Sequence, residues 1–352
     1  MRILLLSHEM TYTGAPNSLL NVARVLRSHR HEVDVYTLKK GDFSYVFRRY
    51  RFEVKVFEPD IFDKEKCRQY DIAICNTVFC GEAALRLQNI IPTVLYLREA
   101  ENLPDILRDN GIDEGYIRNA ENIVCVSEYA ARFIEKTYSP KNIRILHNFL
   151  IKPSYKTASL NRINGRIRFL IAATIEPRKG IAVAIEAFRL LPKNLQEQAA
   201  LDIYGRAPEW SAYYHAPLLA EKYDGIEYHG ELKDGKERMY HNSNVVIVPS
   251  FDESCSLTAL EGAMYARPLI VTENVGAKYL IDGSGFVVKT GSAESLSRAM
   301  RFFIEHRSEL DTMGRNSYRS FKKHSDKNAY YKGLNQIFQE VLWKKNKQRF
   351  QS

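Results

Sequence analysis

Residues 245–264 read VVIVPSFDESCSLTALEGAM. The first four residues form an apolar run that stops at Pro249, which is typical of a strand buried on both faces. An amphipathic helical pattern starts near Leu257, and Ser254 and Ser256 before it are residue types that cap helix N-termini. A buried strand that leads through a short polar loop into a helix is typical of a parallel sheet covered by helices. This stretch therefore predicts an α/β fold.

The same alternation of short apolar runs and helical patterns continues along the rest of the chain. Strands are predicted at residues 2–7, 32–38, 71–76, 93–97, 122–126 and 144–147 in the first half, and at 168–173, 201–205, 225–229, 245–249, 268–272 and 285–288 in the second. Helices are predicted between them, among others at 16–28, 128–137 and 181–191. Open α/β sheets bind ligands at the carboxyl ends of their strands. Two successive doubly wound units thus predict a ligand in a cleft between them.

The organisation of the 352 residues follows from this pattern. We expect an N-terminal Rossmann-like domain over residues 1–151 and a C-terminal Rossmann-like domain over 167–325. Residues 152–166 are polar, lack periodicity and carry proline and glycine, so they are predicted to be a linker. Residues 326–352 are predicted to form a helix, at about 328–345, and a basic tail.

Hydrophobic and cysteine content indicate the compartment. No apolar run approaches the roughly 18 residues of a membrane span, and the short apolar run at residues 3–6 suits a buried first strand better than a signal peptide. The five cysteines are odd in number and form no CxxC pair, so they are expected to be small core residues in a reducing compartment. The chain is thus predicted to be cytosolic, without disulfides or a zinc site.

A net charge of +9 favours an anionic partner, and nucleic acid, anionic lipid and phosphorylated substrates all fit it. Residues 39–57 interleave lysines and arginines with phenylalanines and tyrosines, and the chain ends in a second basic segment, residues 344–349. Such segments suit an anionic membrane surface or single-stranded nucleic acid, or else their rings are simply core. No RNP, KH or helix-turn-helix pattern is present, so no nucleic-acid partner is expected and the membrane ranks first.

The loop after residues 245–249 carries residue types that suit a nucleotide ligand. Glu253 lies at the predicted carboxyl end of a strand, and the helix that follows points its free amides and the positive end of its dipole toward this edge. Such a helix terminus holds a pyrophosphate without needing a metal. Glu261, about one turn into the helix, is placed to accept hydrogen bonds from a ribose diol, and Glu253 from sugar hydroxyls. The alternative is a capped helix with two surface glutamates.

The whole segment resembles the E-x7-E signature of family 4 glycosyltransferases, which usually reads PSxxEGFGLxxLEAMAxGxPVV. The resemblance implies the GT-B fold, with two facing Rossmann-like domains and a C-terminal helix that crosses back to the first. It also implies that Glu253 contacts the donor sugar and Glu261 the ribose. The backbone of Ser254, Cys255, Ser256 and Leu257 would line the phosphates and the sugar; the serines replace family glycines.

A second motif, AATIEPRKG at residues 172–180, resembles the VGRLxxxKG of the same family, whose arginine and lysine bind donor phosphates. Lys179 matches the lysine. Thr174 occupies the arginine position, so the role of the arginine is predicted to pass to Arg178. The alternative is a solvated basic helix start. Because positive charge at a helix N-terminus opposes the helix dipole, a bound anion would explain these cations.

In the first domain, Gly14 and Ala15 resemble the family loop that faces the donor phosphates from the opposite domain. This loop is not GxGxxG, so a nicotinamide cofactor gains no support. Relatives often have His-Glu where this chain has Arg98 and Glu99, so a histidine role cannot be carried over. Arg98 is a candidate to bind an anionic acceptor or a phosphate, and the alternative is an ion pair with Glu99 or Glu101.

The pair His147-Asn148, at another predicted strand end, resembles the hinge-proximal asparagine of the family. We expect this pair to be structural.

Together these features predict a retaining, metal-independent glycosyltransferase. It would move a hexosyl-type sugar from a nucleotide sugar, most plausibly a UDP- or GDP-sugar, to a glycan or lipid-linked glycan in polysaccharide or cell-envelope synthesis. No Asp-x-Asp motif is present to hold a metal, so Lys179, Arg178 and the helix amides would neutralise the leaving group. No cofactor is expected, and the protein would lie in the cytoplasm or on the inner membrane face. The alternatives are a nucleotide-sugar sensor without activity and an epimerase or phosphorylase of similar fold.

Overall fold

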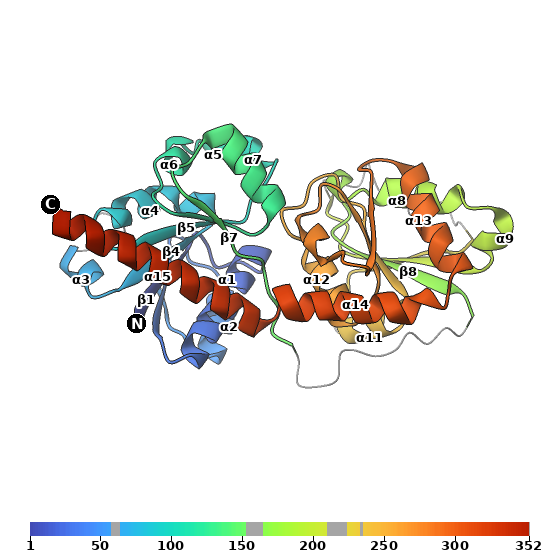
Figure 1. The fold of residues 1–352 in the computed structure, drawn as a ribbon, viewed down its shortest axis with the longest axis horizontal. Helices are drawn as coiled ribbons and strands as arrows, with labels where there is room; N and C mark the ends of the chain where they lie inside the picture. The colour runs from blue at the N-terminus through green and yellow to red at the C-terminus, as the bar shows by residue number, and fades with distance from the viewer. Residues whose placement is uncertain (58–63, 153–164, 210–223, 233–234, 352) are drawn as a thin grey trace. The chain divides into compact units, whose positions relative to one another are not determined.

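The computed structural model describes residues 1–57, 64–152, 165–209, 224–232 and 235–351, and the side chains as far as residue 344 (Figure 1). Its contacts divide the chain into two compact units. Unit 1 comprises Met1–Asn148 and Lys327–Ser352, and unit 2 comprises Phe149–Asp326. Of the predicted linker, residues 153–164 lie outside the described residues.

Unit 1 is built on a seven-stranded sheet in the order β3-β2-β1-β4-β5-β6-β7, and every pairing in it is parallel. The strands are β1 (Arg2–Ser7), β2 (Glu32–Thr37), β3 (Val54–Val56), β4 (Ile72–Asn76), β5 (Thr93–Leu97), β6 (Ile123–Cys125) and β7 (Ile143–Ile145). The strand order reverses between β1 and β4. The carboxyl ends of these two neighbours, at Ser7 and Asn76, therefore mark the place where doubly wound sheets bind ligands.

Helices connect the strands of unit 1. They are α1 (Gly14–Ser28), α2 (Ser44–Arg49), α3 (Lys64–Arg68), the 3₁₀ helix η1 (Val78–Cys80), α4 (Gly81–Gln88), α5 (Leu103–Asn110), α6 (Gly115–Arg118) and α7 (Glu128–Tyr138). α7 begins as predicted, because the Ser127 side chain accepts a hydrogen bond of 3.1 Å from the backbone N–H of Ala130.

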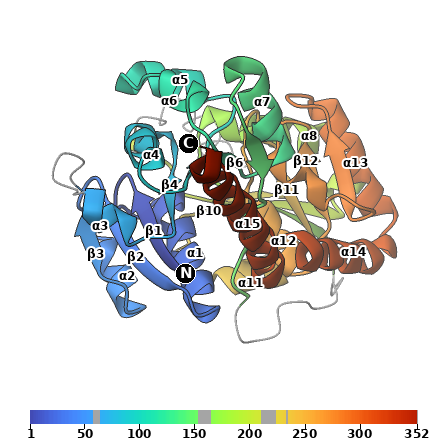
Figure 2. The ribbon, with the colours of Figure 1, turned by 60° about the vertical axis from the view of Figure 1, so that its left-hand side comes forward.

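The C-terminal helix α15 (Lys327–Gln351) returns to unit 1 and packs on it, as Figures 1 and 2 show. Tyr331 on this helix bonds His31 at 3.0 Å, and Glu340 accepts a hydrogen bond of 2.8 Å from Arg144. Its buried side chains recur at helical spacing and are Tyr330, Leu334, Ile337, Phe338 and Val341. The predicted crossing of the last helix back to the first domain is therefore confirmed.

Unit 2 has a six-stranded parallel sheet in the order β10-β9-β8-β11-β12-β13. Its strands are β8 (Ile167–Ala172), β9 (Ala199–Tyr204), β10 (Ile226–Gly230), β11 (Val245–Val248), β12 (Leu269–Thr272) and β13 (Gly285–Val288). Its helices include η2 (Pro177–Lys179), α8 (Ile181–Arg189), α9 (Lys193–Gln196), α11 (Lys236–His241), α12 (Leu257–Met264), η4 (Gly276–Leu280), α13 (Ala293–Glu305) and α14 (Glu309–His324). Here the order reverses between β8 and β11, which places the loops after Ala172 and Val248 next to each other.

The two doubly wound sheets confirm the predicted fold class. Every predicted strand is present, with bounds that match or differ by at most two residues, and among the described strands only β3 lacked a predicted counterpart. All five cysteines are buried and free, and burial raises the pKa of Cys75, Cys80 and Cys125 well above that of an exposed thiol. Among the described residues, no helix combines the length and apolar character needed to cross a membrane.

The basic and aromatic segment at residues 39–57 divides into a buried part and an exposed part. Its phenylalanines belong to the core and are Phe43, Phe47, Phe52 and Phe57. Tyr45 and Tyr50 are 63% and 43% exposed. The guanidinium of Arg24, on the neighbouring helix α1, lies 4.3 Å from the centre of the Tyr50 ring. Two rings with surrounding cations thus remain at the surface, and the other rings have a structural role.

Candidate functional site

The loop between β11 and α12 is fixed by backbone hydrogen bonds. Glu253 forms a bridge with Val275: its N–H donates to the carbonyl of Asn274 at 3.2 Å, and its carbonyl accepts from Gly276 at 2.8 Å. Ser256 is the N-cap of α12, since its hydroxyl accepts from the N–H of Ala259 at 3.3 Å. The loop therefore presents a rigid helix N-terminus at the carboxyl edge of the sheet.

Ser256 has a backbone φ of 84°, a conformation that L side chains rarely adopt. The resembling family has glycine at this position, and glycine adopts this φ without strain. The serine therefore keeps the backbone path expected of the glycine and adds a capping hydroxyl. Of its neighbours in the predicted donor loop, Cys255 is buried, Ser254 is half-buried and Leu257 opens the helix at the surface.

Lys179, Arg178 and Glu253 are brought together at this edge. The ammonium of Lys179 forms an ion pair with Oε2 of Glu253, and both side chains are largely buried, at 16% and 18% exposed. Nη1 of Arg178 lies 3.6 Å from the same oxygen and donates to the carbonyl of Asp252 at 2.9 Å. Arg178 also bonds Glu176, at 2.7 Å. Two cations and one carboxylate predicted to bind the donor thus share one cluster. With Glu176, the second carboxylate partner of Arg178, the formal charges of the cluster cancel.

Gly180 explains how the loop that carries these cations reaches β11. It has a φ of 66°, and a Cβ there would lie 2.0 Å from the carbonyl oxygen of Pro249. The N–H of Phe251 donates to the carbonyl of Arg178 at 2.8 Å, which holds the two loops in register. A larger residue at position 180 would separate Lys179 from Glu253. The glycine after the lysine is therefore a requirement of close backbone approach.

Glu261, predicted to hold a ribose, is held by two side chains of α11. The Tyr240 hydroxyl donates to Oε2 at 2.6 Å, and the Lys236 ammonium donates to Oε1 at 2.5 Å. Tyr240 is fully buried, and burial, followed by the nearby Glu261 carboxylate, raises the pKa of its hydroxyl well above the usual value. It therefore stays a hydrogen-bond donor. Sequence reasoning missed both residues, because α11 carries no motif.

Thr174, which occupies the position of the family arginine, follows β8 by two residues and is half-buried. Arg178 makes its side-chain contacts with Glu176, Asp252 and Glu253. The predicted transfer of the arginine role to Arg178 thus stays a prediction, with geometry that places its guanidinium beside Lys179 and Glu253.

In unit 1, Arg98 follows the carboxyl end of β5. Its Nε donates to Oδ1 of Asn76 at 2.9 Å, its Nη1 donates to Oδ1 of Asn148, and its guanidinium lies 3.9 Å from the centre of the Tyr96 ring. Among the residues that the structure describes, no carboxylate forms an ion pair with this guanidinium. The alternative of an Arg98 ion pair with Glu99 or Glu101 is therefore wrong.

The Glu99 carboxylate is buried and turned toward the backbone. It accepts hydrogen bonds from the N–H groups of Arg98, at 2.7 Å, and Val78, at 3.3 Å. Burial raises the pKa of Glu99, and these hydrogen bonds oppose the shift only in part. Glu99 therefore organises the loop and has no contact with the guanidinium of its neighbour.

A second polar group, missed by sequence reasoning, lies at the reversal point of the same sheet. His8 follows β1, bonds the Thr77 hydroxyl at 3.1 Å through Nδ1, and places Nε2 3.5 Å from Glu9. Burial lowers the pKa of His8, so its ring is neutral near pH 7. Thr77 has a φ of 77°, which is strained for a β-branched residue. His8 and Thr77 each follow a predicted strand, and this position was their only sequence signal.

The predicted Gly14 and Ala15 open α1 beside this group. The amide of Asn76 donates to the carbonyl of Ala15 at 3.2 Å, so the α1 terminus is tied to the side chain that also holds Arg98. A Cβ at Gly14 would meet no atom of the described residues within 4 Å. No contact with this part of the chain therefore requires glycine there.

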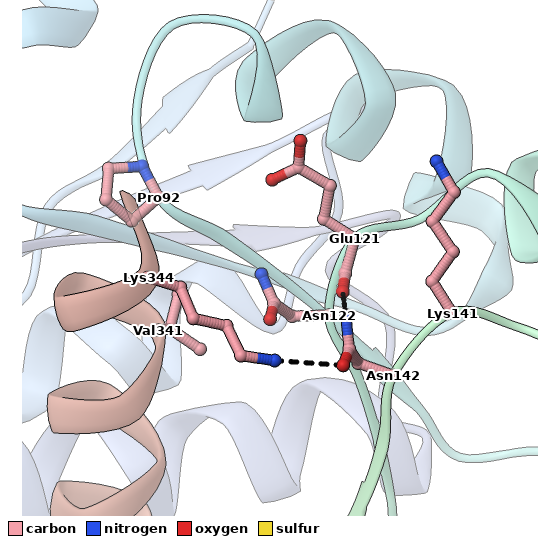
Figure 3. Close-up of a pocket in the computed structure, with 7 residues that line it drawn as sticks. All are labelled: Pro92, Glu121, Asn122, Lys141, Asn142, Val341 and Lys344. Carbon is pink, nitrogen blue, oxygen red and sulfur yellow. Dashed lines mark hydrogen bonds between the residues drawn. The ribbon is translucent and has the colours of Figure 1, made fainter. Parts of the chain in front are cut away.

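Two other features lie apart from these groups. A cavity of about 160 Å³ beneath α15 is lined by Pro92, Glu121, Asn122, Lys141, Asn142, Val341 and Lys344 (Figure 3). It lies at the amino ends of β5, β6 and β7, opposite the edge that carries Arg98. Among the described residues, only Asp202, Glu227 and His229 group as a metal site would require, but Arg168 already bonds both oxygens of Asp202, at 2.5 and 2.9 Å.

Comparison with known proteins begins with two family models that match the chain in succession. Glycosyltransferase Family 4 matches residues 12–150, and Glycosyl transferases group 1 matches residues 156–320. The chain is 24% identical over 222 residues to the D-rhamnosyltransferase WbpZ of Pseudomonas aeruginosa, an alignment that covers 59% of this chain and 56% of that protein. It is 25% identical over 181 residues to a lipopolysaccharide 1,2-N-acetylglucosaminetransferase of Salmonella typhimurium, which covers 47% and 48%. The chain thus spans about half the length of these curated relatives.

The fold is shared with solved structures over nearly the full length. HepE of Anabaena in complex with UDP superposes with a TM-score of 0.79 at 16% identity, and the match covers 97% of this chain and 100% of that one. HepE in complex with UDP-glucose superposes with a TM-score of 0.72 at 18% identity, covering 96% and 99%. With two parallel Rossmann-like units and a matching family model over each half, the chain belongs to the family 4 glycosyltransferases of GT-B fold.

Proposed function

We propose that this protein transfers a hexosyl group from a nucleotide-sugar donor to a glycan or lipid-linked glycan acceptor. The observation that carries the proposal is the Lys179–Glu253 ion pair at the carboxyl edge of unit 2, with Arg178 beside it and the N-terminus of α12 following Glu253. These are the groups needed to bind a sugar diphosphate: cations, free helix amides and a carboxylate that accepts hydroxyl hydrogen bonds.

In the proposed reaction, the nucleotide diphosphate leaves from the anomeric carbon of the sugar. Its developing negative charge would be stabilised by Lys179, Arg178 and the amides that follow Ser256. Glu253 would accept hydrogen bonds from the sugar hydroxyls, and Glu261, oriented by Tyr240, would accept those of the ribose. Positive groups of the protein supply the charge stabilisation, so the mechanism we propose is metal-independent. It also retains the anomeric configuration, as the family resemblance implies.

The donor is proposed to be a UDP-sugar, with a GDP-sugar as the second candidate. Support comes from the HepE complexes with UDP and UDP-glucose, which share the fold. Gly14 is proposed to admit the donor phosphates close to the α1 backbone, since no contact with the described residues requires a glycine there. No further cofactor enters the proposal.

The acceptor is proposed to belong to cell-envelope or polysaccharide synthesis, in line with the lipopolysaccharide and rhamnosyl transferases that the chain resembles. The exposed Tyr45 and Tyr50 with their basic neighbours suit docking at the cytoplasmic face of a membrane. Flotation with anionic and neutral vesicles tests this part separately. Equal recovery with both vesicle types would remove the membrane proposal and leave the transferase proposal intact.

The central test is a melting-temperature screen of the full chain with UDP-, GDP-, ADP- and dTDP-sugars, followed by an assay for sugar release from the donor that binds. A binding donor raises the melting temperature by mass action. Slow hydrolysis of that donor, or transfer to an added glycan, would support the enzyme. Binding without either reaction would instead support the alternative of a nucleotide-sugar sensor. Conversion of the donor into an isomeric nucleotide sugar would support an epimerase, and cleavage that needs free phosphate would support a phosphorylase.

A further inference from the structure

In unit 1, the guanidinium of Arg98 forms no ion pair with any carboxylate of the described residues, although it interacts electrostatically with the buried Glu99. Its side-chain acceptors are the amide oxygens of Asn76 and Asn148, and the ring of Tyr96 lies against its face. Its Nη2 is buried and has no hydrogen-bond partner among the described residues. Arginine stays protonated and offers five N–H donors, so leaving one nitrogen buried and unpaired is unfavourable. A ligand that supplied an acceptor to this guanidinium would offset that cost.

The neighbouring side chains do not neutralise the positive charge of Arg98 by an ion pair. Both amides would neutralise it if they were carboxylates of the same shape, yet asparagine stands at each position. Glu99, adjacent in sequence, gives its carboxylate oxygens to the backbone N–H groups of Arg98 and Val78. Burial raises the pKa of Glu99, and the backbone hydrogen bonds and the charge of Arg98 oppose the shift. The guanidinium is therefore fixed in position and forms no ion pair among the described residues.

The location is that of a ligand site. Asn76, which orients Nε of Arg98, ends β4 at the reversal point of the sheet, and the strained Thr77 follows it directly. The amide nitrogen of Asn76 is bonded to Ala15, so the amide is oriented with its oxygen toward Arg98. Arg98 is thus positioned by a network that connects β4, β5 and the start of α1.

From this geometry we infer that Arg98 binds an anionic group, a phosphate or a carboxylate, on the acceptor substrate. The inference rests on the proposed function, because it assigns the group to the acceptor of the transfer. The proposed donor diphosphate has Lys179, Arg178 and the α12 amides in unit 2, whereas Arg98 is a cation at the carboxyl edge of unit 1 that has no ion-pair partner among the described residues. A planar guanidinium recognises the paired oxygens of phosphate and carboxylate.

The test is titration of the full chain with inorganic phosphate or acetate in the presence of saturating UDP, against chloride at equal ionic strength, with binding followed by calorimetry. UDP fills the donor phosphate positions, so heat from added phosphate or acetate reports another anion site. Asn148→Asp is the informative variant, since it keeps the shape and the acceptor oxygen but gives Arg98 a counter-charge. We expect it to weaken anion binding at least about tenfold with an unchanged or higher melting temperature. Arg98→Gln should abolish the binding, and Arg132→Gln, at an exposed position on α7, should leave it unchanged.

UDP binding distinguishes a failure of the Arg98 inference from a failure of the proposed function. All three variants should bind UDP as the wild type does, which also shows that they fold. Anion binding that UDP abolishes would assign Arg98 to the donor and overturn the acceptor assignment. Undiminished anion binding in Asn148→Asp and Arg98→Gln, or no anion binding by the wild type, would overturn the inference altogether. A wild-type chain that binds phosphate or acetate through Arg98 but fails to bind any nucleotide would contradict the proposed function while leaving the anion site established.

Discussion

Lys179 and Glu253 form an ion pair across two loops of unit 2, although 74 residues separate them in the chain. One residue comes from the loop after β8 and the other from the loop after β11, the two strands at which the order of the sheet reverses. In the absence of ligand each side chain neutralises the other. The phosphates of a donor would offer Lys179 a new partner, and the sugar hydroxyls would offer one to Glu253. Donor binding must therefore compensate for the loss of this ion pair.

Replacing Lys179 by alanine is expected to lower the turnover number by about 100-fold or more, because one preorganised cation facing the leaving group is lost. The fold should persist, since Arg178 remains 3.6 Å from Glu253. Turnover of the donor tests the loss of activity, and the circular dichroism spectrum tests whether the variant is folded. Lys193→Ala, at an exposed position of α9, is the matched control, and wild-type turnover in Lys179→Ala would contradict the proposed site.

Tyr240→Phe should raise the KM for the donor several-fold and leave kcat nearly unchanged, because the hydroxyl orients Glu261 and touches no reacting atom. Removing the hydroxyl should also cost about 1 kcal/mol of stability, as for a typical hydrogen bond. Lys236→Ala is the comparison: the Lys236 side chain is 61% exposed, and screened pairs of this kind contribute at most about 1 kcal/mol. Steady-state kinetics on both variants measures the difference. A fall in kcat with constant KM in Tyr240→Phe would exclude a positioning role.

Two substitutions of Ser256 should shift stability in opposite directions. Glycine relieves the strain of a φ of 84°, worth about 1 kcal/mol or more, and loses only a few tenths as a cap. Alanine keeps the strain and loses the capping hydrogen bond to Ala259, at a cost of about 1 kcal/mol. Urea unfolding should therefore rank Ser256→Gly above the wild type and Ser256→Ala below it. Equal losses in both variants would mean that the hydroxyl, and not the backbone, dominates at this position.

His8 predicts a specific dependence of stability on pH. Burial lowers its pKa in the folded state, whereas the unfolded chain keeps a value near 6.5. The unfolded state therefore binds the proton more tightly, and the free energy of unfolding falls as pH drops below about 6.5 toward the folded value. His8→Gln should remove this part of the dependence. Urea unfolding of both proteins at several pH values between 8 and 5 measures it, because the difference between the two curves cancels the groups that they share. Parallel curves would show that His8 contributes nothing.

The fold was predictable because fully buried parallel strands are uninterrupted apolar runs, and runs such as residues 93–97 and 285–288 became strands with those bounds. β3 was missed because three residues next to aromatic loop positions carry no periodic signal. At the site, the family resemblance supplied the expectation that Lys179 and Glu253 act together. Strand order then explains why they meet.

The residues that sequence reasoning missed are those that act by tertiary contact alone. Tyr240 looks like any core tyrosine of a short helix until Glu261 is found bonded to its hydroxyl. Asn148 looked structural, and its role as an uncharged acceptor for Arg98 follows only from a contact that spans 50 residues. A single sequence does not show which distant amide will face a guanidinium.

The return of α15 to unit 1 has a consequence for how the chain matures during synthesis. Unit 2 is an insertion whose two ends are bonded to each other, since the N–H of Leu150 donates to the carbonyl of Ser325 at 3.0 Å. The ribosome therefore completes the inserted unit first, although unit 1 begins the chain. Unit 1 waits for Tyr330 and Phe338, which fill its core from α15, so it can finish folding only after the whole of unit 2 has been synthesised.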